Sequence, residues 1–236
     1  MEEVRHFIKK VLKVSPLYSA YLGVADHFWP KFRQHRRRQR EESEKKLPKL
    51  SLSQDHIEHC ELVLDRAALL AKLPNSGVVA EIGVAKGEFS SQILHKTNPE
   101  SLHLIDIWDS ERYHHLYGAV RSRFDEEIED GTVEISQRFS TEAADHFPDD
   151  YFDWVYIDTD HAYETTRDEL QAYAPKIKAG GIIAGHDYTL GNWKKAYRYG
   201  VIEAVHEFCV RHNWKLAYLT AEVKENRSFA IKRMGE

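Results

Sequence analysis

The chain has 236 residues, and its composition is that of a soluble, folded protein. Apolar residues make up 42% and charged residues 30%, which excludes a disordered chain and a membrane-embedded one. Lysine and arginine number 33 against 38 acidic residues, and the net charge of -5 gives no general attraction for nucleic acid, so no nucleic-acid partner is expected. Only two cysteines, Cys60 and Cys209, are present, far apart and in helix-like contexts. Neither a disulfide framework nor a zinc cluster is readable, and a cytoplasmic protein is expected.

Residues 1–50 are predicted to form a helical extension. Apolar residues recur at helical spacing from Val4 to Leu12, with basic residues between them, which predicts an amphipathic helix. No apolar run reaches the roughly 20 residues of a membrane span, and no signal peptide is visible. The helix is interpreted either as a peripheral contact with the inner membrane face or, as we favour, as a helix packing on its own domain or in a homodimer. The charged run that follows it, "KFRQHRRRQREESEKK", is interpreted as a solvated connector.

Residues 51–236 are predicted to form a single domain in which helices and strands alternate. An amphipathic helix is expected between Ser51 and Pro74. The strands expected after it are residues 77–84, 101–108, 132–139, 152–159 and 180–188, and the helices expected among and after them are residues 88–97, 111–128, 140–147, 164–177 and 195–212. This alternation predicts a doubly wound, mostly parallel, Rossmann-like α/β sheet. Two further strands, residues 214–220 and 227–233, would add an antiparallel hairpin at its edge.

Polar motifs follow the first two strands of this sheet, where open α/β sheets bind their ligands. In "AEIGVAKGEFS", Glu81 ends a strand, and Gly83 and Gly87 precede a helix. Glycines let a backbone turn tightly and approach a ligand, although the dinucleotide fingerprint G-x-G-x-x-G is not met. Asp106 ends the next strand about twenty residues later, where a carboxylate can accept both hydroxyls of a ribose. The motifs together predict a nucleoside site, while each alone also fits a structural turn or helix cap.

Acids and histidines follow the fourth and fifth strands. The stretch "IDTDHAYE" supplies Asp158, Asp160 and His161, and "GGIIAGHDY" supplies His186 and Asp187. Because neighbouring strand ends lie side by side, these groups can present oxygen and nitrogen ligands to one cation. A metal would lower the pKa of a bound hydroxyl, and a histidine or carboxylate would take its proton. Each residue alone is more often a satisfied polar group, so the hypothesis depends on the cluster.

These stretches together resemble the motif series of class I S-adenosylmethionine-dependent methyltransferases. The resemblance extends from Asn75 to Arg233, and its most specific part is the segment of the fourth and fifth strands. That segment is similar to a bacterial branch with the motifs I-D-G-D-H-x-Y-E and G-H-D-Y, related to metal-dependent O-methyltransferases of catechols and antibiotic sugars. The resemblance implies S-adenosylmethionine as cofactor, together with a divalent cation, Mg²⁺ or Mn²⁺.

The resemblance also implies a role for each motif residue. The residues expected to contact the cofactor are Glu81, Gly83, Gly87, Asp106, Ser140 and Asp158. The expected cation ligands are Asp158, His186 and Asp187, and the expected proton acceptors are Asp160, His161 and His186. The chain departs from the branch where Thr159 replaces a glycine, where Phe139 replaces an adenine-binding acid, and where His186 replaces a carboxylate.

The expected activity is methylation of a hydroxyl group on a small molecule or a glycan. Methyl transfer is an in-line displacement on a sulfonium, so the enzyme mainly positions the acceptor and makes it nucleophilic. Two other classes stay open: a nicotinamide-dependent oxidoreductase, which the missing fingerprint disfavours, and a non-catalytic nucleotide-binding or membrane-recruited assembly protein. RNA methylation through the basic run from Arg33 to Arg40 is disfavoured by the net acidity.

Overall fold

A computed structural model of the chain describes residues 44–109, 113–192, 197–222 and 225–235, and the separate positions 29, 34, 35, 37, 38, 41 and 42. The chain divides into two compact units, residues 1–47 and 48–236. In the first unit the described positions from Trp29 to Lys46 are helical, and Arg37 pairs with Glu41 one turn later at 2.8 Å. The amphipathic helix predicted from Val4 to Leu12 lies outside the described residues. None of the helices that can be described is long and apolar enough to cross a membrane.

The second unit contains a mixed sheet whose described strands follow the order β1-β9-β10-β6-β5-β2-β3-β4. Their bounds are β1 Glu61–Val63, β2 Val78–Ile82, β3 Ser101–Asp106, β4 Val133–Gln137, β5 Phe152–Ile157, β6 Ile177–Gly185, β9 Trp214–Thr220 and β10 Phe229–Arg233. Strands β2 to β6 are parallel, and β10 lies antiparallel between β6 and β9. The predicted doubly wound, Rossmann-like sheet with its C-terminal hairpin is confirmed. The strand order reverses between β2 and β5, and ligands bind at such a point in open α/β sheets.

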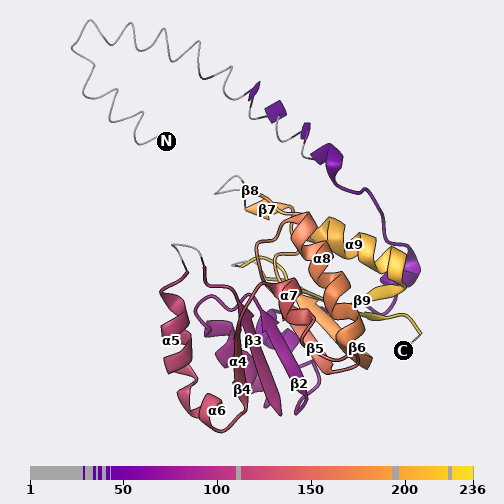
Figure 1. The fold of residues 1–236 in the computed structure, drawn as a ribbon. Helices are drawn as coiled ribbons and strands as arrows, with labels where there is room; N and C mark the ends of the chain where they lie inside the picture. The colour runs from indigo at the N-terminus through magenta and orange to yellow at the C-terminus, as the bar shows by residue number, and fades with distance from the viewer. Residues whose placement is uncertain are drawn as a thin grey trace, which may run out of the picture. The chain divides into compact units, whose positions relative to one another are not determined.

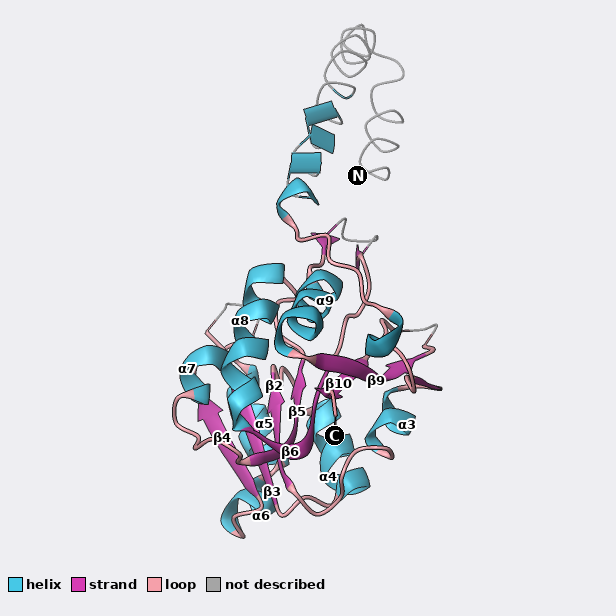
Figure 2. Ribbon diagram, turned by 90° about the vertical axis from the view of Figure 1, so that its right-hand side faces the viewer, coloured by secondary structure: helices cyan, strands magenta, loops and turns pink. Residues whose placement is uncertain are grey.

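Helices cover both faces of the sheet (Figures 1 and 2). One face carries α3 Arg66–Leu70, α4 Glu88–Thr97, α5 Leu116–Arg123 and α6 Asp125–Glu129, and the other carries α7 Ser140–Ala144, α8 Tyr163–Tyr173 and α9 Val201–His212. Strand β5 shows how the sequence serves both layers, because successive side chains of a strand point to opposite faces. Trp154 and Tyr156 pack in the α3–α4 core, and Val155 and Ile157 pack in the α8–α9 core.

Three predicted helices were wrong in their extent. The segment from Ser51 to Pro74 forms the 3-10 helix Gln54–His56, strand β1 and helix α3 instead of one helix. Its apolar residues had helical spacing, but pairing of β1 with β9 prevails, and the Asp65 carboxylate starts a new helix by accepting the Ala68 N–H at 2.8 Å. The predicted helix 111–128 is divided into α5 and α6. The predicted helix 195–212 begins only at Val201, because β8 Tyr197–Arg198 pairs with β7 Gly191–Asn192.

Gly83 allows the ends of β2 and β5 to touch. Its φ is +92°, and a Cβ atom at this position would lie 2.1 Å from the carbonyl oxygen of Asp158. The Asp158 N–H donates to the Ile82 carbonyl at 2.7 Å, and the Gly83 N–H donates to the Ile105 carbonyl at 2.8 Å. Three strand ends are therefore joined through backbone contacts that only glycine permits at this position.

Glu169 is a buried carboxylate of α8 behind the ends of β4 and β5. Its Oε2 accepts a hydrogen bond from the Thr159 hydroxyl at 2.9 Å, whereas its Oε1 has no partner among the described residues. Burial raises the pKa of Glu169 from 4.5 to about 7, although the Ser140 and Thr159 hydroxyls act in the opposite direction. Glu169 thus connects the loops after two strands through a group that titrates near neutral pH.

We predict that Gly83→Ala lowers the free energy of unfolding by about 3 kcal/mol, since the new methyl group meets backbone and the φ is unfavourable. Urea unfolding measures this. Gly131→Ala is the matched control, because Gly131 also has a positive φ, +83°, yet its Cβ would meet nothing within 4 Å. The control should lose only about 1 kcal/mol. Equal losses in the two variants would contradict the role given to the contact with Asp158.

We predict that Glu169→Gln removes part of the pH dependence of stability. The unfolded chain releases this proton as pH rises through 4.5, whereas the folded protein keeps it until about 7. Stability therefore falls over this window and stays low above it, by about 3 kcal/mol at most. Unfolding at pH 5 and pH 8 tests this, with Glu164→Gln in the exposed first turn of the same helix as control. The prediction fails if both variants keep the wild-type pH dependence.

Candidate active site

The candidate site lies at the carboxyl ends of β2, β3, β5 and β6. The loop after each of these strands contains a non-glycine residue in the left-handed region: Ala85 at φ +48°, Trp108 at +45°, His161 at +64° and Asp187 at +58°. Such conformations are unfavourable and persist only where the surroundings impose them, which is frequent at functional sites. The backbone itself thus marks the strand ends where the sequence motifs predicted a site.

The loop from Gly83 to Gly87 turns tightly above a buried acid. Glu81 is 2% exposed and accepts a hydrogen bond from the Ser90 hydroxyl. Burial raises the pKa of Glu81 to about 8, against the opposing effect of the Ser90 bond. Gly87 precedes α4 at a φ of +72°, and a Cβ atom there would lie 2.9 Å from the Phe124 ring. A close contact therefore explains why each of the two positions is a glycine.

Asp106 holds the same loop from the end of β3. Its Oδ2 accepts the N–H groups of Val84 and Ala85, each at 2.9 Å, and its Oδ1 accepts the Trp108 N–H at 3.0 Å. The buried Trp108 closes the turn by donating its indole N–H to the Ala85 carbonyl at 3.0 Å. A carboxylate offers about four acceptor positions, so one remains here for a ribose hydroxyl. The two ribose contacts predicted for Asp106 would require one loop contact to be released.

Ser140, predicted to lie beside the adenine, starts α7. Its carbonyl accepts the Tyr173 hydroxyl at 2.8 Å, which ties the residue to α8. The neighbouring Phe139 is 53% exposed and presents a ring next to this helix start. The side chain available for contact with a base at this position is therefore the aromatic ring of Phe139.

The acids and histidines after β5 and β6 do come together. His161 Nε2 lies 3.0 Å from Asp187 Oδ2, and His161 Nδ1 lies 4.0 Å from Asp158 Oδ1. One ligand atom from each of these three residues lies within 4.8 Å of the other two. His186 Nδ1 lies 3.7 Å from Asp158 Oδ2 and 3.6 Å from Asp187 Oδ1. Two carboxylates therefore stand between two imidazoles.

Charge and burial oppose each other in this cluster, and charge prevails. Burial tends to raise the pKa of Asp187, but the neighbouring His161 and His186 lower it well below its usual range. Burial tends to lower the pKa of His186, but Asp158 and Asp187 outweigh it and raise the pKa to about 9. His186 Nε2 is buried and has no partner among the described residues. The two carboxylates thus favour the charged form of His186, and the two histidines favour the charged form of Asp187.

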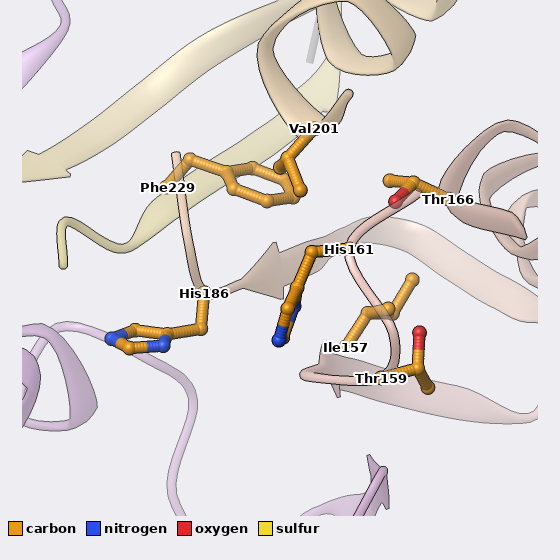
Figure 3. Close-up of a pocket in the computed structure, with 7 residues that line it drawn as sticks. All are labelled: Ile157, Thr159, His161, Thr166, His186, Val201 and Phe229. Atoms are coloured by element: carbon orange, nitrogen blue, oxygen red, sulfur yellow. The ribbon is translucent and has the colours of Figure 1, made fainter. Parts of the chain in front are cut away.

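A small pocket adjoins the two histidines (Figure 3). Figure 3 shows both imidazoles beneath the apolar side chains of Val201 and Phe229. The complete lining is Ile157, Thr159, His161, Thr166, His186, Val201 and Phe229. The pocket thus lies between the ends of β5 and β6 and the first turns of α8 and α9.

Asp160 lies outside the cluster although the motif contains it. The residue is exposed, its Oδ1 accepts the Ala162 N–H at 2.9 Å, and its Oδ2 accepts the Thr165 hydroxyl at 3.0 Å. These bonds serve the start of α8, as is usual for an aspartate at this position. The geometry gives Asp160 a structural role at the start of α8.

Two residues of the site were missed in the sequence. Arg66 Nη1 lies 3.4 Å from Asp158 Oδ2, and its Nη2 donates to Glu225 at 2.7 Å. The Asn226 side-chain amide donates to Asp187 Oδ1. Arg66 comes from α3 and Asn226 from the β9–β10 connection, and neither belongs to a readable motif. Only the tertiary fold brings them to the strand ends.

The residues present fit both groups implied by the motifs. For S-adenosylmethionine, Gly83 and Gly87 allow the tight turn of the loop, and Asp106 retains one acceptor position. For a divalent cation, the ligand atoms that lie close together come from Asp158, Asp187 and His161, whereas the predicted imidazole ligand was that of His186. Two carboxylates and an imidazole suit Mn²⁺ better than Mg²⁺. The carboxylate oxygens that face His186 also contact Arg66 and the Asn226 amide, so a cation beside His186 would have to displace these partners.

Comparison with known proteins agrees with this geometry. Residues 80–188 match the family model described as a methyltransferase domain, and this range includes every loop described above from Glu81 to Asp187. No curated protein matches the chain in sequence.

Similar solved structures show the same fold at low identity. A provisionally assigned rRNA methylase from Clostridium thermocellum is 13% identical, with 72% of this chain and 94% of that chain covered and a TM-score of 0.55. The tRNA methyltransferase TrmK of B. subtilis is 15% identical, with coverages of 75% and 68% and a TM-score of 0.52. TrmK of M. capricolum, in complex with S-adenosylhomocysteine, is 15% identical, with coverages of 72% and 68% and a TM-score of 0.51. The family match over residues 80–188 and the shared fold together support an S-adenosylmethionine-dependent methyltransferase domain in this part of the chain.

Proposed function

We propose that the enzyme methylates a hydroxyl group of a small molecule or glycan, with His161 as the general base. The observation that carries this proposal is the 3.0 Å contact between His161 Nε2 and Asp187 Oδ2, next to Asp158. When bound, S-adenosylmethionine supplies a methyl group on a sulfonium centre. An alcohol is a weak nucleophile, so a base must remove its proton during the transfer.

Asp187 orients His161 for this task. With a proton on Nε2, the imidazole donates to Asp187 Oδ2 and keeps the lone pair of Nδ1 on the side of Asp158. Nδ1 then takes the proton of the acceptor hydroxyl, and the buried Asp187 stabilises the resulting imidazolium. The Asn226 amide holds the other oxygen of Asp187 and so fixes the direction of the carboxylate. His161 is further held against the Tyr199 ring, with centroids 4.8 Å apart.

Divalent-metal assistance forms part of the proposal, with Asp158, His186 and Asp187 as the ligands. When bound, the cation lowers the pKa of a hydroxyl that it coordinates. His161 also lies within reach of the two carboxylates, but an imidazole that ligates a cation can no longer accept a proton at the same atom. We assign the ligand role to His186, because its Nδ1 faces both carboxylates at 3.6 and 3.7 Å, and we keep His161 as the base.

RNA is the alternative acceptor. Two of the similar structures are tRNA methyltransferases, and a third carries an rRNA methylase assignment, but their 13% to 15% identity establishes only the fold. The net charge of -5 favours a small-molecule or glycan acceptor. Transfer of labelled methyl groups to total RNA, compared with transfer to phenol and glycan extracts, distinguishes the two classes. Labelling of RNA alone would replace the proposed acceptor class.

We predict that His161→Gln lowers methyl transfer by about 10² to 10⁴-fold, the usual contribution of a general base, and leaves the affinity for S-adenosylhomocysteine unchanged. The measurement is turnover with labelled cofactor, together with calorimetric binding. His95→Gln is the matched control, because His95 is exposed on α4 and bonds only within that helix. If His161→Gln keeps full turnover while Asp160→Asn loses it, Asp160 is the base and the assignment is wrong.

We predict that Mn²⁺ binds the intact chain and stimulates transfer, and that chelation by EDTA reverses the stimulation. Asp158→Ala, Asp187→Ala and His186→Gln should each weaken Mn²⁺ binding at least tenfold, since each removes one ligand. His161→Gln should retain it. Calorimetric titration with Mn²⁺ tests this directly, with circular dichroism to confirm folding. Loss of Mn²⁺ binding in His161→Gln and retention in His186→Gln would exchange the roles of the two histidines.

A further inference from the structure

We propose that Arg66 binds the carboxylate of the methionine part of S-adenosylmethionine. The inference concerns the cofactor and does not depend on the acceptor proposed above. Arg66 was outside every motif of the sequence, and its guanidinium nevertheless reaches the centre of the site. A cation at that place requires an explanation, because the side chain is only 19% exposed.

The guanidinium lies close to the loop from Gly83 to Gly87, which we call the cofactor loop. Its Cζ atom is 4.6 Å from the centroid of the Phe89 ring, two residues after Gly87 in α4. On its other side, Nη1 is 3.4 Å from Asp158 Oδ2 at the end of β5. The arginine therefore stands between the helix that follows the glycine loop and the strand end that Gly83 touches. A ligand that lies along the glycine loop towards Asp158 meets this side chain.

Because acids border the cofactor loop, a ligand with a carboxylate needs a cation at this place. S-adenosylmethionine carries a carboxylate, whereas the acids Asp106 and Asp158 border the loop. An arginine fork matches a carboxylate with two parallel hydrogen bonds and holds its charge at any physiological pH. The other described cations beside the loop are exposed: Lys86 lies in the loop, and Arg123 is 3.5 Å from the Ser91 hydroxyl.

Arg66 is also free to change partners. Its backbone is fixed, because its N–H donates to Glu222 Oε1 at 3.0 Å in the connection after β9. Its Nη2, in contrast, pairs at 2.7 Å with Glu225, whose side chain is 56% exposed. Exposed ion pairs contribute little to stability, so the carboxylate of the cofactor can take the place of Glu225 at small cost. The Nη1 contact with Asp158 can persist during this exchange.

The test compares two ligands that differ only in the carboxylate: S-adenosylhomocysteine and its decarboxylated analogue. Calorimetry on the full chain gives the affinity of the wild type and of Arg66→Met for each. We expect Arg66→Met to bind S-adenosylhomocysteine at least about tenfold more weakly, the effect of losing hydrogen bonds to a charged group, and to bind the analogue as the wild type does. Glu225→Gln should bind S-adenosylhomocysteine more tightly, since a competitor for the guanidinium is removed.

Lys72→Met is the matched control, because it removes an exposed cation just beyond the same helix, where Lys72 pairs with Glu61 at 2.7 Å. Its affinities for both ligands should equal those of the wild type. Equal weakening of both ligands by Arg66→Met would show that the arginine only holds Asp158 in place, and it would overturn the proposal. Unchanged binding of S-adenosylhomocysteine by Arg66→Met would overturn it as well. If the wild type binds neither ligand, the assignment of S-adenosylmethionine as the cofactor is contradicted, and this result is distinct from a failure of the role proposed for Arg66.

Discussion

The contact between the backbones of β2 and β5 at Gly83 is the constraint on which the site depends. The two strands are neighbours at the point where the strand order reverses, and their ends touch at a position where a methyl group would lie 2.1 Å from a carbonyl oxygen. This contact sets the distance between the cofactor loop and Asp158. Everything above it is arranged relative to that distance: Asp106 holds the loop from one side, and the pair His161 and Asp187 stands on the other.

The second organising feature is a balance of charge at the strand ends. Acids close β2, β3, β5 and β6, and a sheet cannot bury so many carboxylates without partners. Each of these carboxyl groups is stabilised in a different way. Glu81 is kept near neutrality by burial, Asp106 is satisfied by backbone N–H groups, and Asp158 and Asp187 face Arg66 and the imidazoles. The acids at the strand ends are thus either buried or paired with a described partner.

Much of this could be predicted from the sequence, and the failures have physical reasons. Strands β2 to β6 could be predicted because their sequences are apolar runs that end in polar motifs. Helix α4 was predicted at its observed bounds, Glu88–Thr97, because a glycine precedes it and the spacing of its apolar residues is regular. The segment from Ser51 to Pro74 failed because a three-residue strand forms only when β9 is present to pair with it. Arg66 and Asn226 could not be found, since they reach the site from elements far away in sequence. The choice between His161 and His186 likewise depends on side-chain geometry that spacing alone does not contain.

The position of β10 in the sheet affects how the chain can fold during its synthesis on the ribosome. Among the described strands, β9 and β1 are attached to the rest of the sheet only through β10, which comes after both in the sequence. Until β10 is synthesised, β6 presents an open edge, and the pair of β1 and β9 has no strand that joins it to the rest of the sheet. A nascent chain thus exposes unpaired strand edges until β10 has been made, the condition that favours association between chains and recruitment of chaperones. The same strand also follows the connection that carries Glu225 and Asn226, so the contacts of these residues with Arg66 and Asp187 form only after β9 has been made.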